Sequence, residues 1–143
     1  MNDAGAVTSG FLDSNIFIRF FTWDHPEHAR LARDLFERVE LGEIVVHITD
    51  TVVFETAFTL EKFYRAPRQQ ISDAWMRLLE LPALVAANKQ TLRETFALWV
   101  SRSNRSFADC FHLVSAKAMG LDTMITFDRN MSIPGVRRVE PPL

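Results

Sequence analysis

Four acidic residues stand at positions in this 143-residue chain where their carboxylates could meet: Asp13, Glu55, Asp109 and Asp128. Each one adjoins a run of apolar residues, and a carboxylate in apolar surroundings is expensive unless a partner compensates its charge. Two carboxylates about 5 Å apart repel each other by about 3 kcal/mol at an effective dielectric constant of about 20. A hard divalent cation removes this repulsion, and oxygen ligands favour Mg²⁺ or Mn²⁺.

A divalent cation held by carboxylates suits the hydrolysis of a phosphodiester. It polarises a phosphoryl oxygen, lowers the pKa of a bound water and stabilises the leaving oxygen, so that no covalent nucleophile is needed. We therefore predict that the four acids are both metal ligands and catalytic residues. Two alternatives remain open: a metal-dependent phosphatase for small phosphate esters, and a catalytically inactive module that binds RNA or a protein.

Two of the four acids come at the ends of predicted strands. Asp13 follows the apolar pair Phe11-Leu12, and Asp128 ends a strand predicted over 123–127. The carboxyl ends of parallel strands share one edge of the sheet, which is where open α/β folds bind ligands. We therefore expect both carboxylates at the same edge.

The other two acids lie near the starts of predicted helices. Glu55 is in the second turn of a helix predicted from residue 49 or 50 to about 65, and its apolar neighbours place it on a buried face. Asp109 is in the first turn of a helix predicted over 106–120, where Ser106 and Asp109 have the spacing of a capping box. Helices that follow strands begin at the carboxyl edge of the sheet, so chain direction brings these acids to the same rim.

The remaining elements continue this alternation. Further helices are predicted over 14–21, 24–42, 68–81 and 88–102, and further strands over 43–48, 83–86 and 136–139. Asp24 and Glu27 have a capping-box spacing at the start of the second of these helices, and Gly42 stops it. Alternating strands and helices predict an α/β fold around a mostly parallel sheet.

Bulk composition fits one globular domain. Hydrophobic residues make up 48% of the chain, and no apolar run is long enough to span a membrane. We predict a flexible tail over 1–9, with no secretory signal, and one domain over 10–143. The single cysteine excludes an internal disulfide and fits a reducing cytoplasm. The net charge of -2 gives no overall electrostatic attraction for a nucleic acid. Local arginines and bound cations would have to attract the phosphates.

Taken together, the acidic segments resemble the PIN-domain nucleases, and within them the VapC-type toxins of bacterial type II toxin–antitoxin systems. Each segment alone is a weak signal, but their order and spacing match over nearly the whole chain, from Phe11 to Val139. The matching segments are Leu12-Asp13-Ser14-Asn15-Ile16-Phe17, Thr51-Val52-Val53-Phe54-Glu55-Thr56-Ala57, Ser106-Phe107-Ala108-Asp109-Cys110-Phe111-His112-Leu113 and Ile125-Thr126-Phe127-Asp128-Arg129.

The resemblance implies a single PIN-like domain with a five-stranded parallel sheet, and a Mg²⁺- or Mn²⁺-dependent endoribonuclease. It implies that the four acids form the catalytic quartet and that Ser14 and Asn15 order the site. A homodimer and a cognate antitoxin protein are the implied partners. Many family members carry a further acid where this chain has Asn130, which leaves open whether one or two metal ions bind.

Four arginines are candidate contacts for RNA phosphates. Arg102 and Arg105 flank the loop before Asp109, and Arg129 directly follows Asp128. Arg19 is the fourth candidate. Guanidinium groups bind phosphate in a bidentate geometry, although most surface arginines are simply solvated.

Overall fold

The computed structural model describes residues 7–143, which form six helices, five short strands and two compact units. The first unit ends at Ala87, and the second runs from Asn88 to Leu143. No helix within the described residues is both long and apolar enough to cross a membrane. The predicted tail over 1–9 lies outside these residues as far as residue 6, and Ser9 already belongs to the first strand.

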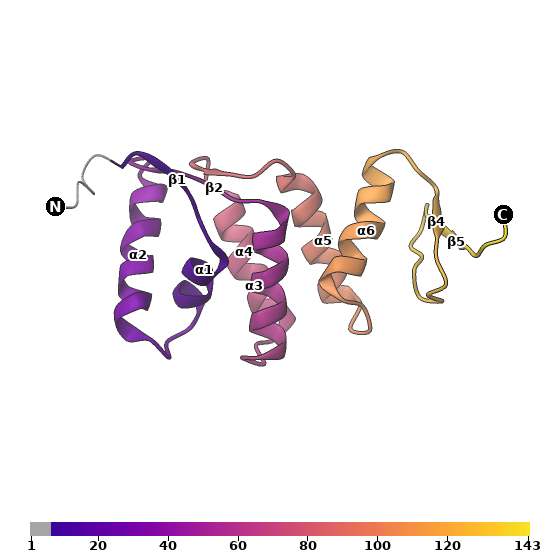
Figure 1. The fold of residues 1–143 in the computed structure, drawn as a ribbon, viewed down its shortest axis with the longest axis horizontal. Helices are drawn as coiled ribbons and strands as arrows, with labels where there is room; N and C mark the ends of the chain where they lie inside the picture. The colour runs from indigo at the N-terminus through magenta and orange to yellow at the C-terminus, as the bar shows by residue number, and fades with distance from the viewer. Residues whose placement is uncertain (1–6) are drawn as a thin grey trace. The chain divides into compact units, whose positions relative to one another are not determined.

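A three-stranded parallel sheet organises the first unit (Figure 1). Its order is β1-β2-β3, with Phe11 opposite His47 and Val46 opposite Leu84. Two helices follow β1 and two follow β2, so each parallel connection crosses over through a helix pair. The elements are β1 Ser9–Phe11, α1 Ser14–Phe21, α2 Pro26–Glu40, β2 Val45–His47, α3 Asp50–Lys62, α4 Arg68–Leu79 and β3 Leu84–Val85.

Aromatic packing fixes the helices of this unit. Phe17 of α1 is fully buried and stacks on Trp75 of α4 with 4.7 Å between ring centroids. Its ring also lies 5.3 Å from that of Phe36 in α2. Such ring pairs stabilise by about 0.5–1.5 kcal/mol beyond the burial of their area. The core therefore locks α1, which begins beside Asp13, against two other helices.

The second unit contains two helices and a two-stranded sheet. Helix α5 (Lys89–Ser101) packs against α6 (Phe107–Ala118), and β4 (Thr123–Ile125) pairs in parallel with β5 (Arg137–Val139). The rings of Phe96, Trp99 and Phe107 meet between the two helices. A smaller apolar cluster holds α6 to the segment after β4, and its buried members are Leu113, Ala116, Met131 and Val136.

The predicted α/β class and parallel pairing are confirmed, but the single five-stranded sheet is wrong. The strands form one sheet of three and another of two. Each strand has only two or three residues, shorter than the predicted 43–48 and 123–127, so few ladder hydrogen bonds are available to extend either sheet. The predicted single domain over 10–143 remains a prediction.

The predicted capping box of the second helix is also wrong. His25, not Asp24, caps α2, and its Nδ1 accepts a hydrogen bond from the His28 N–H at 3.2 Å. Pro26 occupies the first helical position, where its fixed φ fits and no N–H is needed. Asp24 does not cap the helix and instead contacts Thr22, Tyr64 and Arg19.

Candidate active site

Asp13 caps α1 and retains an exposed carboxylate. Its Oδ1 accepts a hydrogen bond from the Ser14 N–H at 2.7 Å, and the Ser14 hydroxyl lies 3.5 Å from the same oxygen. Capping occupies one carboxylate oxygen and leaves the second for another ligand. Ser14 has the position that a site-ordering role requires, and the role itself stays a prediction.

Glu55 lies on the exposed side of α3, whereas the sequence suggested a buried face. The buried positions of this helix follow one stripe with a period of 3.6 residues, and Glu55 falls outside that stripe. Its apolar neighbours in sequence are therefore not its neighbours in space. The burial argument for a cation fails at this residue, but an exposed carboxylate is accessible to both a cation and a substrate.

Chain direction brings Asp13 and the Glu55 helix to one edge of the first sheet. Asp13 lies two residues beyond Phe11, and α3 begins three residues beyond His47, the parallel partner of Phe11. Helix α1, which Asp13 caps, also packs against α3. The expectation that these two elements leave the sheet at its carboxyl edge is confirmed within the first unit.

Asp109 lies in the first turn of α6 and is half-buried. Its backbone N–H donates to the Ser106 hydroxyl at 3.1 Å, so the predicted cap is present. This cap uses the main chain of Asp109, not its side chain. The carboxylate is consequently available for ligation while the helix start is held in place.

Asp128 is exposed and occupies a tight turn after β4. Its Oδ1 accepts the Asn130 N–H at 2.9 Å, and its own N–H donates to the Thr126 hydroxyl at 3.0 Å. The Arg138 Nε–H donates to the Asp128 carbonyl at 3.0 Å. This is an Asx turn, and it leaves Oδ2 of Asp128 outside the hydrogen bonds of the turn.

Arg105 does not have the exposure expected of a phosphate contact. Arg105 is only 6% exposed, and its Nη2–H donates to the Ser132 carbonyl at 3.2 Å. The guanidinium therefore points into the protein and joins the segment before α6 to the segment after Asp128. Sequence position alone could not reveal this, since a loop arginine is usually solvated.

The other three candidate arginines keep some exposure. Arg129 is exposed, and Arg102 is half-buried at the end of α5. Arg19 lines a cavity of about 280 Å³ between α1 and α2, together with Asn15. Asn15 itself is exposed, two residues from Asp13. The predicted phosphate-binding roles of these arginines, and the site-ordering role of Asn15, remain predictions.

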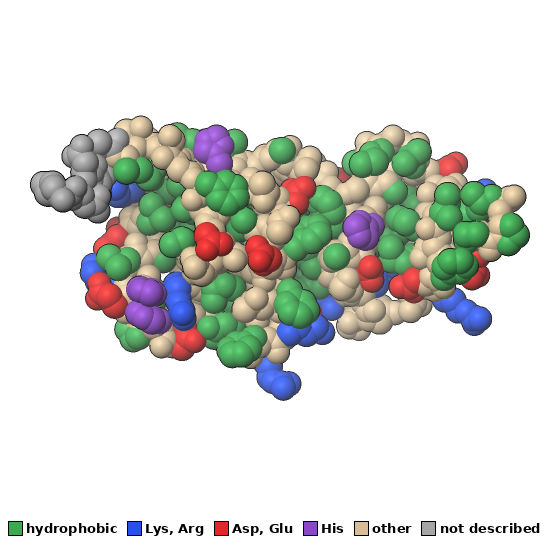
Figure 2. All heavy atoms as spheres, in the orientation of Figure 1, with side chains coloured by type: hydrophobic (Ala, Val, Ile, Leu, Met, Phe, Trp, Pro, Cys, Tyr) green, Lys and Arg blue, Asp and Glu red, His purple; other side chains and the backbone are tan. Residues whose placement is uncertain are grey.

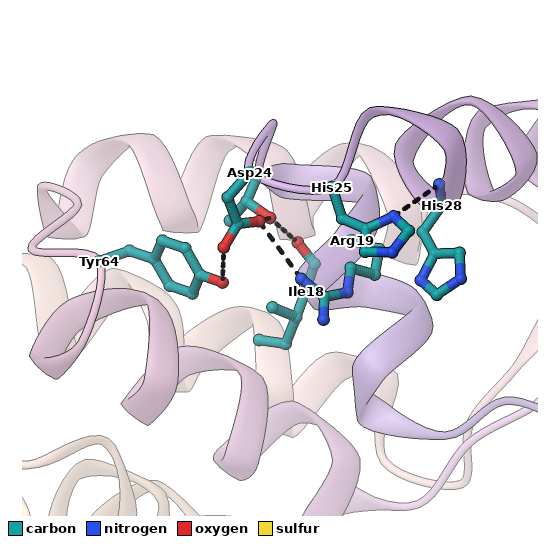
Figure 3. Close-up of polar contacts among 7 residues, drawn as sticks. Ile18, Arg19, Asp24, His25, His28 and Tyr64 are labelled. Carbon is teal, nitrogen blue, oxygen red and sulfur yellow. Dashed lines mark hydrogen bonds and ion pairs between the residues drawn. The ribbon is translucent and has the colours of Figure 1, made fainter.

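A polar network at the corner between α1 and α2 was not foreseen from the sequence. Asp24 accepts hydrogen bonds from the Tyr64 hydroxyl at 2.8 Å and the Thr22 hydroxyl at 3.1 Å, and its Oδ1 lies 3.3 Å from Nη1 of Arg19 (Figure 3). The Tyr64 hydrogen bond is the largest cause that lowers the pKa of Asp24, with Thr22 and Arg19 adding to it. The same bond raises the pKa of Tyr64. Forty residues separate Tyr64 from Asp24, so local sequence patterns carry no signal for this pair.

The donor set fits a hard divalent cation, although neither unit holds a complete site. Within residues 7–143, no group of three or more His, Cys, Asp or Glu side chains is placed to hold a metal ion. Asp13 and Glu55 belong to the first unit, and Asp109 and Asp128 belong to the second. Carboxylate oxygens are the ligands that Mg²⁺ and Mn²⁺ prefer.

Positive charge is dispersed on the face of the molecule that Figure 2 draws. On the face drawn in Figure 2, the Lys and Arg side chains are scattered among apolar and acidic ones instead of forming one patch. This agrees with the net charge of -2 and means that any RNA binding depends on a few local contacts.

The family profile and a curated relative indicate one family. The family profile described as PIN domain matches residues 10–135, which include all four acids. A VapC ribonuclease of Aquifex aeolicus (strain VF5) is 25% identical over 130 residues, covering 91% of this chain and 95% of that protein. The crystal structure of Mycobacterium tuberculosis VapC20, a Sarcin-Ricin loop cleaving toxin, matches with 20% identity and a TM-score of 0.40, covering 92% and 99% of the two chains. The resemblance to VapC-type proteins is thus confirmed, and the chain belongs to the PIN domain family.

Proposed function

We propose that this protein is a Mg²⁺- or Mn²⁺-dependent endoribonuclease that hydrolyses RNA phosphodiester bonds and acts as the toxin of a toxin–antitoxin pair. The observation that carries this proposal is the PIN family match over residues 10–135, because that range contains the whole acidic quartet. The VapC ribonuclease relative supports both the activity and the toxin role.

Asp13, Glu55, Asp109 and Asp128 are the proposed metal ligands and catalytic residues. A bound divalent cation would supply positive charge that polarises the phosphoryl oxygen and eases the loss of a proton from water. The protein's own contribution is to fix the carboxylates: Ser14 orients Asp13, Ser106 holds the start of the Asp109 helix, and the Asx turn holds Asp128. Fixed ligands need no reorganisation during the reaction, which favours the transition state.

Arg19, Arg102 and Arg129 are the proposed phosphate contacts. Arg105 is not proposed for this role, because only 6% of its surface is exposed. Asn15 is proposed to order the site beside Asp13. Three of the four acids are exposed, which suits a polymeric substrate better than the closed pocket that a small phosphate ester needs. This observation favours the nuclease over the phosphatase.

The working protein is proposed to be a cytoplasmic homodimer whose activity is silenced by a cognate antitoxin. The dimer and the antitoxin come from the VapC resemblance, which the Aquifex relative supports.

Cleavage of total RNA in the presence of Mn²⁺, compared with hydrolysis of a phosphomonoester, tests the proposed function. We expect RNA cleavage that EDTA abolishes and that is lost in a variant carrying both Asp13→Asn and Asp109→Asn. Phosphomonoester hydrolysis without RNA cleavage would instead support the phosphatase. Neither activity from the intact protein would support the inactive binding module.

A further inference from the structure

Arg105 is the buried arginine of the second unit, and it lies in the segment between α5 and α6. Its Nη2–H donates to the main-chain carbonyl of Ser132 at 3.2 Å, and its Nη1 lies 3.9 Å from the Met131 sulfur. Met131 is itself buried in the cluster that includes Leu113 and Val136. The guanidinium is therefore inserted between the start of one helix and a loop about 27 residues further along the chain.

A buried guanidinium is unusual between the start of a helix and a loop inside the protein. Taking the charge out of water carries a desolvation penalty, and apolar side chains of similar volume often stabilise a protein as well or better. Packing alone therefore gives no reason for an arginine here. An apolar side chain cannot donate a hydrogen bond to the Ser132 carbonyl. The Arg105 hydrogen bond therefore fixes the position of the loop in a way that apolar packing could not.

The two segments that Arg105 joins are the ones that carry the acids of this unit. The next residue, Ser106, caps α6 and accepts the Asp109 N–H at 3.1 Å. Ser132 lies four residues after Asp128, in the loop whose first part forms the Asx turn. A second arginine, Arg138 of β5, holds the carbonyl of Asp128 itself at 3.0 Å.

We propose that Arg105 is a positioning residue that holds the Asp128 loop against the start of α6, so that Asp109 and Asp128 are directed at the same cation. This inference rests on the proposed function, because it assigns Arg105 a task within the acidic site. Arg105 touches neither the substrate nor the cation. It acts through the backbone on either side of the two carboxylates, and partners of this kind tune metal affinity and activity.

The test compares Arg105→Lys, Arg105→Met and the exposed control Arg129→Gln with the wild-type protein. Lysine retains the charge but lacks the planar fork of donors, and methionine retains most of the volume without any donor. Mn²⁺ affinity is measured from the EPR signal of free Mn²⁺, beside kcat, KM, the salt dependence of KM and the melting temperature. All activity measurements are made well below the lowest melting temperature of the set.

We expect Arg105→Met to weaken Mn²⁺ binding and lower kcat by roughly 10–100-fold, with KM for RNA nearly unchanged. Arg105→Lys should lose less on both readouts. Arg129→Gln should raise KM and reduce its salt dependence without changing Mn²⁺ affinity, as expected for a lost phosphate contact.

Two results would overturn the inference. A lower melting temperature with unchanged Mn²⁺ affinity and kcat in both Arg105 variants would show a merely structural role. A raised KM with a weaker salt dependence would show that Arg105 contacts RNA. Wild-type protein that binds Mn²⁺ but cleaves no RNA would contradict the proposed function instead, and the Mn²⁺ comparison would still decide the role of Arg105.

Discussion

At the scale of single residues, capping and metal ligation can use different atoms of the same acid. Asp13 caps α1 with Oδ1, and Asp128 holds its turn with Oδ1. Asp109 joins the Ser106 cap through its backbone N–H. Each of these three acids thus has a structural task that leaves at least one carboxylate oxygen for a cation. A structural role in a cap or turn is therefore compatible with the proposed role as a metal ligand.

The two tasks of Asp13 can be separated by substitution. Asp13→Asn retains an oxygen that accepts the Ser14 N–H, so we expect the stability of the metal-free protein to change little. Because the amide is a weak cation ligand, the rise in melting temperature on adding Mn²⁺ should shrink, and RNA cleavage should fall roughly 100-fold or more. Thermal melts with and without Mn²⁺ measure the first effect.

Asp13→Ala is the matched control, because it removes both the cap and the ligand. It should cost about 1 kcal/mol of stability even without metal, as the loss of a helix N-cap usually does. A Mn²⁺-induced rise in Asp13→Asn as large as in the wild type would remove Asp13 from the ligand set.

Sequence patterns predicted the four acids as site residues, which stays a prediction, but they misjudged the surroundings of two candidate residues. Glu55 was placed on a buried face because its neighbours in the chain are apolar, yet the stripe of buried residues in α3 passes beside it. Arg105 was predicted to contact RNA phosphates because it flanks the loop before Asp109, yet it contacts residues 131 and 132. Burial depends on contacts between distant segments, and local sequence does not encode them.

At the scale of elements, the α1–α2 corner is tied to the end of α3. Tyr64, just after α3, donates to Asp24, which also meets Arg19 of α1 (Figure 3). Asp13 caps α1, and Glu55 lies in α3. The Tyr64–Asp24 hydrogen bond therefore adds a polar link to the packing of α1 against α3.

Tyr64→Phe should lower stability in a pH-dependent way. The Tyr64 hydroxyl, followed by Thr22 and Arg19, holds the pKa of Asp24 below its ordinary value. A lowered pKa in the folded state stabilises the protein above the unfolded-state pKa of about 4, and this contribution is lost as the pH falls through the folded-state value. We expect a small fall in the urea midpoint at pH 7 that shrinks toward pH 3.

The same substitution in an Asp24→Asn background provides the control. There the charged acceptor is already gone, so Tyr64→Phe should lower the urea midpoint less, with little change between pH 7 and pH 3. A loss of equal size at both pH values in the otherwise unchanged chain would show that the phenol acts through packing, not through the Asp24 charge.

The turn between α6 and β4 depends on one glycine. Gly120 has a φ of +76°, which disfavours any side chain, while an added Cβ would meet nothing within 4 Å. Gly120→Ala should therefore destabilise the protein by about 1 kcal/mol through backbone strain alone. Gly10→Ala is the control, since Gly10 has equally open space and no positive φ. Equal urea midpoints for the two variants would contradict this account.

The sequence predicted the order of helices and strands well, because caps, stops and apolar periodicity are local. The helix starts at Ser106 and at residues 49–50 follow from such signals, and α6 carries the predicted Ser106 cap. The cap of α2 was missed because histidine is a less common cap than aspartate, so the spacing of Asp24 and Glu27 was misleading.

At the scale of the whole molecule, four acids are divided between two units, two in each. The five predicted strands are present, but they form sheets of three and two. Local hydrophobic periodicity does not determine which distant strands pair. The parallel direction of the strands follows from their alternation with helices, and it was predicted correctly. The PIN domain match covers residues of both units, so the family assignment holds for the chain from residue 10 to residue 135.

The central proposal is that Asp13, Glu55, Asp109 and Asp128 act together in one reaction. The most direct test is the rate of RNA cleavage with Mn²⁺ for Asp13→Asn, Asp109→Asn and the double variant, relative to the wild type. Residues that act as one unit are strongly non-additive, so we expect each single variant to lose nearly as much rate as the double. Losses that multiply in the double variant would contradict the claim, because Asp13 and Asp109 would then act independently.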